Sequence, residues 1–170
     1  MKFINGHLYH VYNQGNDKCR VFFSIENYRF FIIKIKKHIL PYADIIAFGL
    51  MPNHFHLLLF VKEDIVPELL NHNLGILLRS YTRAINVQKS RSGSLFRQGT
   101  KSKELFNWDD IHCSDDNYLQ TCFDYIHNNP VKAGLVFKEE DWIYSSAKIY
   151  KFKTKSNLVN TQMAKELQLI

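Results

Sequence analysis

The stretch 44-DIIAFGLMPNHFHLLLFV-61 decides the fold. Two apolar runs, residues 44–51 and 54–61, are joined by the dipeptide Pro52-Asn53, and both of these residues favour tight turns. So short a connection predicts an antiparallel β-hairpin. The density of Leu, Ile and Phe in both runs predicts that this hairpin lies buried in the middle of a sheet.

Further elements are predicted on both sides of the hairpin from hydrophobic periodicity, capping residues and prolines. They are a strand at 7–13, a helix at 24–40, a helix at about 64–89, a strand at 101–106 and a helix from Ser114 or Asp115 to near Pro130. This order predicts an α+β fold: a ferredoxin-like βαββαβ sandwich with an antiparallel sheet and an added C-terminal helix. We expect one domain over residues 1–150 and a tail over 151–170, which is either a loose arm or a weak helix at 161–169.

The composition indicates a folded basic protein. A formal net charge of +6 attracts polyanions before any specific contact forms, although a solvated surface is the simpler alternative. Cys19, Cys113 and Cys122 match neither a disulfide framework nor a metal knuckle, which favours a reducing, cytoplasmic compartment. We expect no membrane association, because no apolar run is long enough to span a bilayer and no signal peptide opens the chain.

His54 and His56 are separated by the apolar residue Phe55 on the second strand of the hairpin. Alternation along a strand places both imidazoles on one face and Phe55 on the other. Two adjacent imidazoles form half of a metal site, although an H-x-H triplet alone is more often a pair of ordinary polar residues. A third ligand is needed to favour the metal site.

The last predicted helix carries Tyr125 and Asn129, which are four residues apart and therefore share a helix face. This spacing would place a hydroxyl nucleophile beside an amide oxygen that can contact an ion, whereas His127 would point elsewhere. The alternatives are that Tyr125 is one of nine ordinary tyrosines and that Asn128-Asn129-Pro130 is only a helix stop. The remaining histidines, His10, His38, His72 and His112, are expected to be structural or surface residues.

A third cluster is basic, and it begins on the second predicted helix and continues into the segment that follows. Cations interleaved with the aromatic residues Tyr81 and Phe96 suit single-stranded nucleic acid, where phosphates pair with charges and bases stack on rings. A solvated helix face with a loop is an equally good interpretation of this segment. The candidate DNA-binding residues are Arg79, Arg83, Lys89, Arg91, Arg97, Lys101 and Lys103.

Four blocks together resemble the HUH single-tyrosine transposases (IS200-like), and in particular the REP-associated tyrosine transposases. The blocks are YHVYNQGN (9–16), MPNHFHLL (51–58), GSLFRQ (93–98) and DYIHNNPVKAGLV (124–136). The chain after Tyr150 carries no motif of this family that we can identify. The resemblance therefore covers most, but not all, of the sequence.

The resemblance implies a metal-dependent enzyme that cleaves and rejoins single-stranded DNA at hairpins. Tyr125 would form a 5′-phosphotyrosine, and His54, His56 and Asn129 would hold Mg²⁺ or Mn²⁺. Relatives of this kind act as dimers or as monomers, so a homodimer stays one of two alternatives. The competing hypotheses are a single-stranded nucleic-acid-binding module that does not cut, and a replication or mobilisation initiator with the same chemistry.

Overall fold

The computed structural model describes residues 1–107 and 117–170. It contains the predicted order of elements: β1 (His7–Gln14), α1 (Ile25–His38), β2 (Ala43–Met51), β3 (His54–Val61), α2 (Pro67–Gln88), β4 (Lys101–Asn107) and α3 (Asn117–Lys132). The four strands form one antiparallel sheet in the order β2-β3-β1-β4. The α+β class and the antiparallel sheet are therefore confirmed. The predicted start of the last helix at residue 114 or 115 lies outside the described residues, as do His112 and Cys113.

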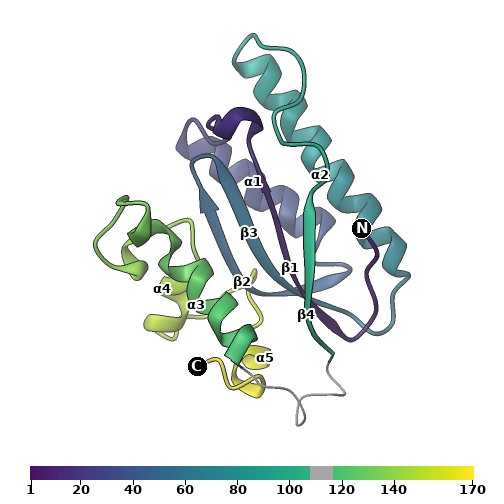
Figure 1. The fold of residues 1–170 in the computed structure, drawn as a ribbon, viewed down its shortest axis with the longest axis vertical. Coiled ribbons are helices and arrows are strands. Elements are labelled where there is room, and N and C mark those ends of the chain that lie inside the picture. Colours follow the sequence, from purple (N-terminus) through teal and green to yellow (C-terminus); the bar gives the residue numbers. More distant parts are fainter. Residues whose placement is uncertain (108–116) are drawn as a thin grey trace.

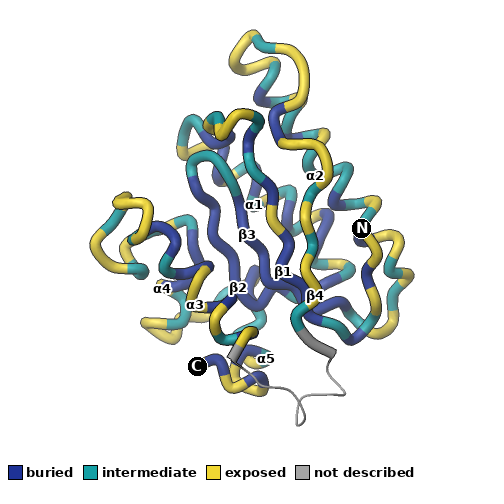
Figure 2. Tube along the Cα trace, viewed as in Figure 1, coloured by how far each residue is buried: buried dark blue, intermediate teal, exposed yellow. Residues whose placement is uncertain are grey.

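Both faces of the sheet are covered, and Figure 1 shows different helices on each face. On one face α1 and α2 pack over the larger core, which includes Phe55, Leu57 and Leu59. On the other face α3 and α5 (Thr161–Glu166) pack over a smaller core that includes Leu58 and Phe60. The alternation in β3 thus separates the two cores, and Figure 2 shows the central strands buried along most of their length.

The sequence predicted that the whole hairpin lies in the middle of the sheet, and this prediction is wrong for one of its two strands. Only β3 is central, whereas β2 is the edge strand. The outer side of β2 is instead covered by backbone hydrogen bonds from later segments. Leu50 N donates to Tyr144 O (2.9 Å), Ser146 N donates to Phe48 O (3.0 Å) and Asn160 N donates to Ile45 O (2.8 Å). These distant pairings explain how an edge strand can be as apolar as a central one.

The C-terminal tail packs against the sheet and is not a loose arm. Leu158 and Val159 enter the larger core, and Leu167 and Leu169 enter the smaller one. The short helix α4 (Ala147–Lys151) crosses residue 150, where we predicted the domain to end. The weak helix predicted within 161–169 is present as α5, and Asn160 caps it by accepting a hydrogen bond from Met163 N at 3.0 Å.

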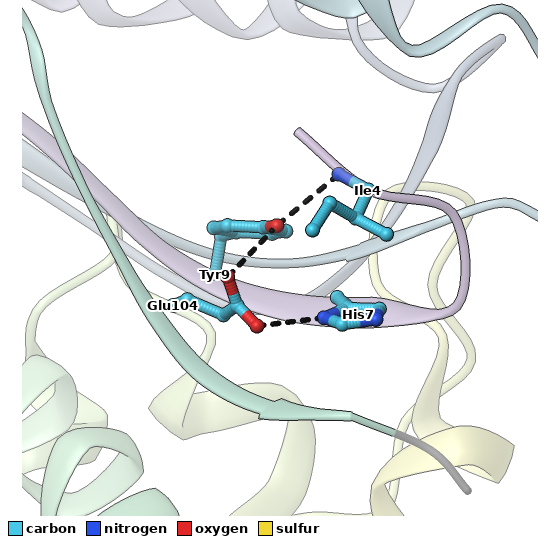
Figure 3. Close-up of polar contacts among 4 residues, drawn as sticks. All are labelled: Ile4, His7, Tyr9 and Glu104. Atoms are coloured by element: carbon cyan, nitrogen blue, oxygen red, sulfur yellow. Dashed lines mark hydrogen bonds and ion pairs between the residues drawn. The ribbon is translucent and has the colours of Figure 1, made fainter. Parts of the chain in front are cut away.

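Glu104 fastens the other edge strand, β4, to β1. Its carboxylate oxygens lie 2.7 Å from His7 Nδ1 and 3.3 Å from the hydroxyl of Tyr9, which itself accepts a hydrogen bond from Ile4 N (Figure 3). Burial, followed by the charge of Glu104, raises the pKa of Tyr9 to about 12, so the phenol stays protonated. These contacts hold β4 in register with β1.

The register of β4 determines which cations reach the face covered by α3. Lys101 lies opposite Tyr12, and Lys103 lies opposite His10. Residues paired directly across strands share one face of the sheet. Lys101 and Lys103 therefore lie beside the β1 side chains that neighbour β3, the strand of His54 and His56.

Candidate active site

One row of the sheet brings together side chains from two of the four sequence blocks, and the cavity above it adds residues of the other two. His56 of β3 lies opposite Gly49 of β2 and Tyr12 of β1, and Tyr12 lies opposite Lys101 of β4. His54 is two residues earlier on β3 and therefore shares this face. Above the row is a cavity of about 440 Å³, which we call the histidine cavity. It is lined by Tyr12, Asn13, Gln14, His54, His56, Arg97, Gln98, Gly99, Lys101, Tyr125 and Asn129.

Helix α3 closes this cavity and supplies Tyr125 and Asn129. The helix runs two residues beyond Pro130, so the predicted stop near this proline is slightly too early. A proline inside a helix leaves the carbonyl four residues earlier without its usual donor, and here that carbonyl belongs to Ile126. Ile126 O faces Gly49, where a Cβ atom added to the glycine would lie only 3.1 Å from this oxygen. A glycine at position 49 therefore permits the close approach of α3 to β2.

His127 fixes the helix from the side away from the cavity. Its Nε2 lies 2.7 Å from Ser146 Oγ, and this hydroxyl accepts a hydrogen bond from Phe48 N at 2.9 Å. Burial lowers the pKa of His127 to about 4, so the imidazole is neutral near pH 7. The expectation that His127 points elsewhere is confirmed, and its contacts show that it links α3 to β2.

We predict that Gly49→Ala displaces α3 and disturbs the cavity. The added methyl would meet a backbone oxygen, which cannot move aside as a flexible side chain can. Overpacking of this kind costs about 1–3 kcal/mol of unfolding free energy. Urea denaturation would measure the loss, with Gly75→Ala as the control, since a methyl there meets only the end of the Arg79 side chain. Unchanged stability of Gly49→Ala would contradict the close packing.

Tyr125 lies beside the histidine strand, and both belong to the same chain. The ring centroids of Tyr125 and His56 are 5.3 Å apart in an edge-to-face arrangement, and the Tyr125 side chain is 41% exposed. Lys132 Nζ lies 5.8 Å from the centre of the Tyr125 ring. No second subunit is needed to bring the tyrosine to the histidines.

His54 and Asn129 approach each other across the cavity. His54 Nδ1 lies 2.6 Å from Asn53 Oδ1, so this ring nitrogen carries the proton and the hydrogen bond orients the ring. Burial lowers the pKa of His54, and a hydrogen bond that the protonated ring can donate to the Asn129 side chain offsets only part of this effect. The amide nitrogen of Asn129 is buried without a hydrogen-bond partner.

His56 also has an unsatisfied nitrogen. Its Nε2 is buried without a partner, whereas its Nδ1 lies 2.9 Å from His10 Nε2. Burial, followed by the charges of His10 and His54, lowers the pKa of His56 to about 2. Burial and the charge of Lys103 lower the pKa of His10 to about 4. Neutral imidazoles with a free nitrogen are the form that binds metal ions.

The contact of His10 with the histidine pair was not foreseen from the sequence. His10 was expected to be a structural or surface residue, and it is buried against His56 with ring centroids 5.0 Å apart. The available signal was its position two residues before Tyr12 on a strand, which places both side chains on one face. Nothing in the sequence alone placed that face against β3.

The donor atoms in the cavity fit a divalent cation with an incomplete protein shell. Two imidazoles and one amide oxygen leave coordination positions for water and phosphate oxygens, as a catalytic ion requires. Within residues 1–107 and 117–170, no group of three or more His, Cys, Asp or Glu side chains is arranged to hold a metal. An ion here would therefore depend on Asn129 and on its substrate to complete the shell.

The basic residues fall into four places. The first is a cavity of about 770 Å³ beside α2, which we call the arginine cavity because it is lined by Arg79, Arg83, Arg91 and Arg97. This cavity and the histidine cavity share the lining residues Asn13, Arg97, Gln98 and Gly99. Lys101 lies in the histidine cavity, and Lys103 lines a third cavity of about 400 Å³ with Tyr118 on the other side of Tyr125. Lys89 lies apart, over the ring of Phe23 at 4.9 Å.

Tyr81 and Phe96 do not provide the stacking surface that the sequence suggested. Both are buried in the larger core, and the Tyr81 hydroxyl donates to Val21 O at 2.8 Å. The exposed aromatic residues that line the histidine cavity are Tyr125 and Tyr12, and Tyr12 has 37% of its surface accessible. Aromatic residues between cations in the sequence therefore belong to the core here: Tyr81 lies on the inward face of α2, and Phe96 enters the core from the segment after α2.

Comparison with known proteins identifies the fold. The chain superposes on the solved structure of a REP-associated tyrosine transposase bound to a REP hairpin, with a TM-score of 0.67 over 94% of this chain and 88% of that one. At 18% sequence identity, this similarity shows a shared fold. The chain therefore has the fold of a REP-associated tyrosine transposase.

A curated sequence relative gives the same family. It is a Haemophilus influenzae protein named "Putative REP-associated tyrosine transposase", 29% identical over 106 residues. The match covers 61% of this chain and 58% of that relative, so it spans less than two thirds of the relative's length. No protein-family model matches the chain. The resemblance deduced from the four sequence blocks is confirmed by both relatives. Among the described residues, no helix is long and apolar enough to cross a membrane.

Proposed function

We propose that this chain is a tyrosine transposase that cleaves and rejoins single-stranded DNA at hairpins through a 5′-phosphotyrosine intermediate. One observation carries the proposal: His54, His56, Asn129 and Tyr125 line a single cavity, although they come from a strand and from a helix much later in the chain. A module that only bound DNA would need none of these four side chains in this arrangement.

The chemistry follows from the positions of these groups. The Tyr125 oxygen attacks a phosphodiester, the bond from phosphorus to the 3′ oxygen breaks, and the departing 3′ oxygen takes up a proton. The phenol gives up its proton to water at the exposed side of the cavity, where the Lys132 ammonium lies 5.8 Å from the ring centre. Attack by another 3′ hydroxyl reverses these steps and joins a new strand, so no nucleotide cofactor is needed.

Mg²⁺ or Mn²⁺ is the cofactor that this proposal requires. His54, His56 and Asn129 would hold the ion, which would polarise the phosphate and offset its developing charge. The unpartnered Nε2 of His56 supports this assignment, since buried polar atoms without partners are rare in folded proteins. Asn53 would keep the Nε2 of His54 available by accepting the proton of its other nitrogen.

A single DNA strand would reach the site along the arginine cavity beside α2. This cavity and the histidine cavity share four lining residues, and Asn13 fixes the connecting loop by donating to Arg97 O at 3.1 Å and to Thr100 Oγ1 at 2.9 Å. Guanidinium groups on both sides of such a channel pair well with phosphates. The hairpin bound by the solved relative supports a hairpin as the partner.

The experiment that tests the function is adduct formation by the wild-type protein. Incubation with Mn²⁺ and a labelled single-stranded hairpin oligonucleotide should give a denaturation-resistant protein–DNA band, and peptide mapping should locate the DNA on Tyr125. The hairpins to try first are those flanking the gene. Specific hairpin binding with no adduct in Mg²⁺ or Mn²⁺ would favour a binding module that does not cut.

The arginine cavity makes a separate prediction for binding. Arg79→Ala combined with Arg83→Ala should weaken hairpin binding and lower the slope of log affinity against log salt by about 1 for each lost phosphate contact. Both side chains are exposed on α2 and line the cavity. Fluorescence anisotropy at several salt concentrations would measure both effects, with the exposed Arg29→Ala on α1 as the control. Equal salt slopes for all variants would place the DNA elsewhere.

A further inference from the structure

The hydrogen bond between His10 and His56 joins two buried imidazoles from adjacent strands. His10 Nε2 and His56 Nδ1 are 2.9 Å apart, and the two rings are inclined by 27°. Tyr12 packs against both rings, with its centroid 4.9 Å from that of His10 and 5.7 Å from that of His56. His10 is 8% exposed and His56 is 5% exposed, so water competes little for the bond.

A hydrogen bond between two neutral imidazoles needs one donor and one acceptor. If His56 Nδ1 carries the proton, His10 Nε2 accepts it and His56 Nε2 keeps a lone pair. In the opposite arrangement, His56 Nε2 would carry a proton in a buried position where it has no acceptor. Leaving a buried donor unsatisfied is costly, so the first arrangement is favoured.

We propose that His10 is a positioning residue that holds His56 in the tautomer whose free Nε2 can bind a divalent cation. The inference rests on the proposed function only in assigning that cation to the histidine cavity. His10 itself would not touch the ion or the DNA phosphate that reacts. Its role parallels that of Asn53, which accepts from the other histidine of the pair at 2.6 Å.

The tautomer can be measured without any metal. Long-range ¹H–¹⁵N spectra of the metal-free protein should show His56 protonated at Nδ1 in the wild type and as a mixture of tautomers in His10→Ala. His10→Gln should restore the Nδ1-protonated form, because the glutamine side-chain oxygen can accept from the same position. A wild-type His56 that is protonated at Nε2 would overturn the inference, whatever the protein does with DNA.

Ion binding gives the second readout. Mn²⁺ titration followed by calorimetry should show affinity about 10–100-fold weaker in His10→Ala than in the wild type, with most of the loss recovered in His10→Gln. His7→Ala is the control, since His7 lies on the same strand and contacts Glu104 on the other side of the sheet. Equal Mn²⁺ affinity in His10→Ala and the wild type would refute the role of His10. A wild type that binds no Mn²⁺ would instead refute the proposed ion and leave the tautomer result standing.

Discussion

Replacing Tyr125 with phenylalanine abolishes the covalent protein–DNA adduct and leaves hairpin binding close to the wild-type level. The variant loses only the attacking oxygen, and the ring keeps its packing against His56. Removing a nucleophile lowers the rate by on the order of 10⁴-fold or more, which is below detection in a gel assay. Adduct formation and anisotropy measured on the same preparation would separate the two effects.

Tyr118→Phe is the matched control for this experiment. Tyr118 is also exposed on α3, and its hydroxyl accepts a hydrogen bond from Lys103 Nζ at 2.7 Å. It lines the third cavity and not the one with His54 and Asn129. We expect this variant to retain the adduct. If Tyr125→Phe still formed an adduct and Tyr118→Phe did not, the nucleophile would be Tyr118.

The second large effect is expected for His56→Ala, which should stop cleavage and weaken Mn²⁺ uptake. The substitution removes the only ring nitrogen of the pair that is both buried and without a partner. It also leaves His10 Nε2 without its bond to His56. We expect at least a 10²- to 10³-fold lower adduct rate, on the order of the loss seen when one group that stabilises the transition state is deleted.

The measurement pairs adduct kinetics with Mn²⁺ calorimetry. His38→Ala is a suitable control, because His38 is equally buried but contacts Asn73 on α2, away from the cavity. Thermal unfolding of each variant would show whether the fold survives. A folded His56→Ala protein that cleaves at the wild-type rate would remove the metal ion from the mechanism.

The sequence was most informative where a local pattern has one structural outcome. The alternation around Phe55 correctly separated the histidine face from the larger core, and the four-residue spacing placed Tyr125 and Asn129 in one cavity. Both conclusions need only the geometry of a single strand or helix. The role of each side chain in the reaction stays a prediction.

The sequence predictions were wrong or incomplete where a residue contacts others that are distant in the sequence. The strand β2 can lie at the edge because segments near residues 145 and 160 form backbone hydrogen bonds with it. The hydrophobic pattern of the sequence does not predict such long-range hydrogen bonds. Tyr81 and Phe96 were interpreted from the charges beside them, but the direction of the Tyr81 ring depends on the face of α2 that meets the sheet, and that of Phe96 on the pairing of its segment with Gly15. His10 was overlooked because its partner is 46 residues away.

The two borders of the sheet differ in a way that affects how copies of the molecule meet. Tyr144, Ser146 and Asn160 close the ladder along β2, so that border offers little to an incoming strand. The opposite border is β4, where Lys101 and Lys103 are exposed. Like charges at an open border discourage self-association into fibrils, yet they do not repel a polyanion. Concentrated solutions of the free protein should accordingly resist aggregation.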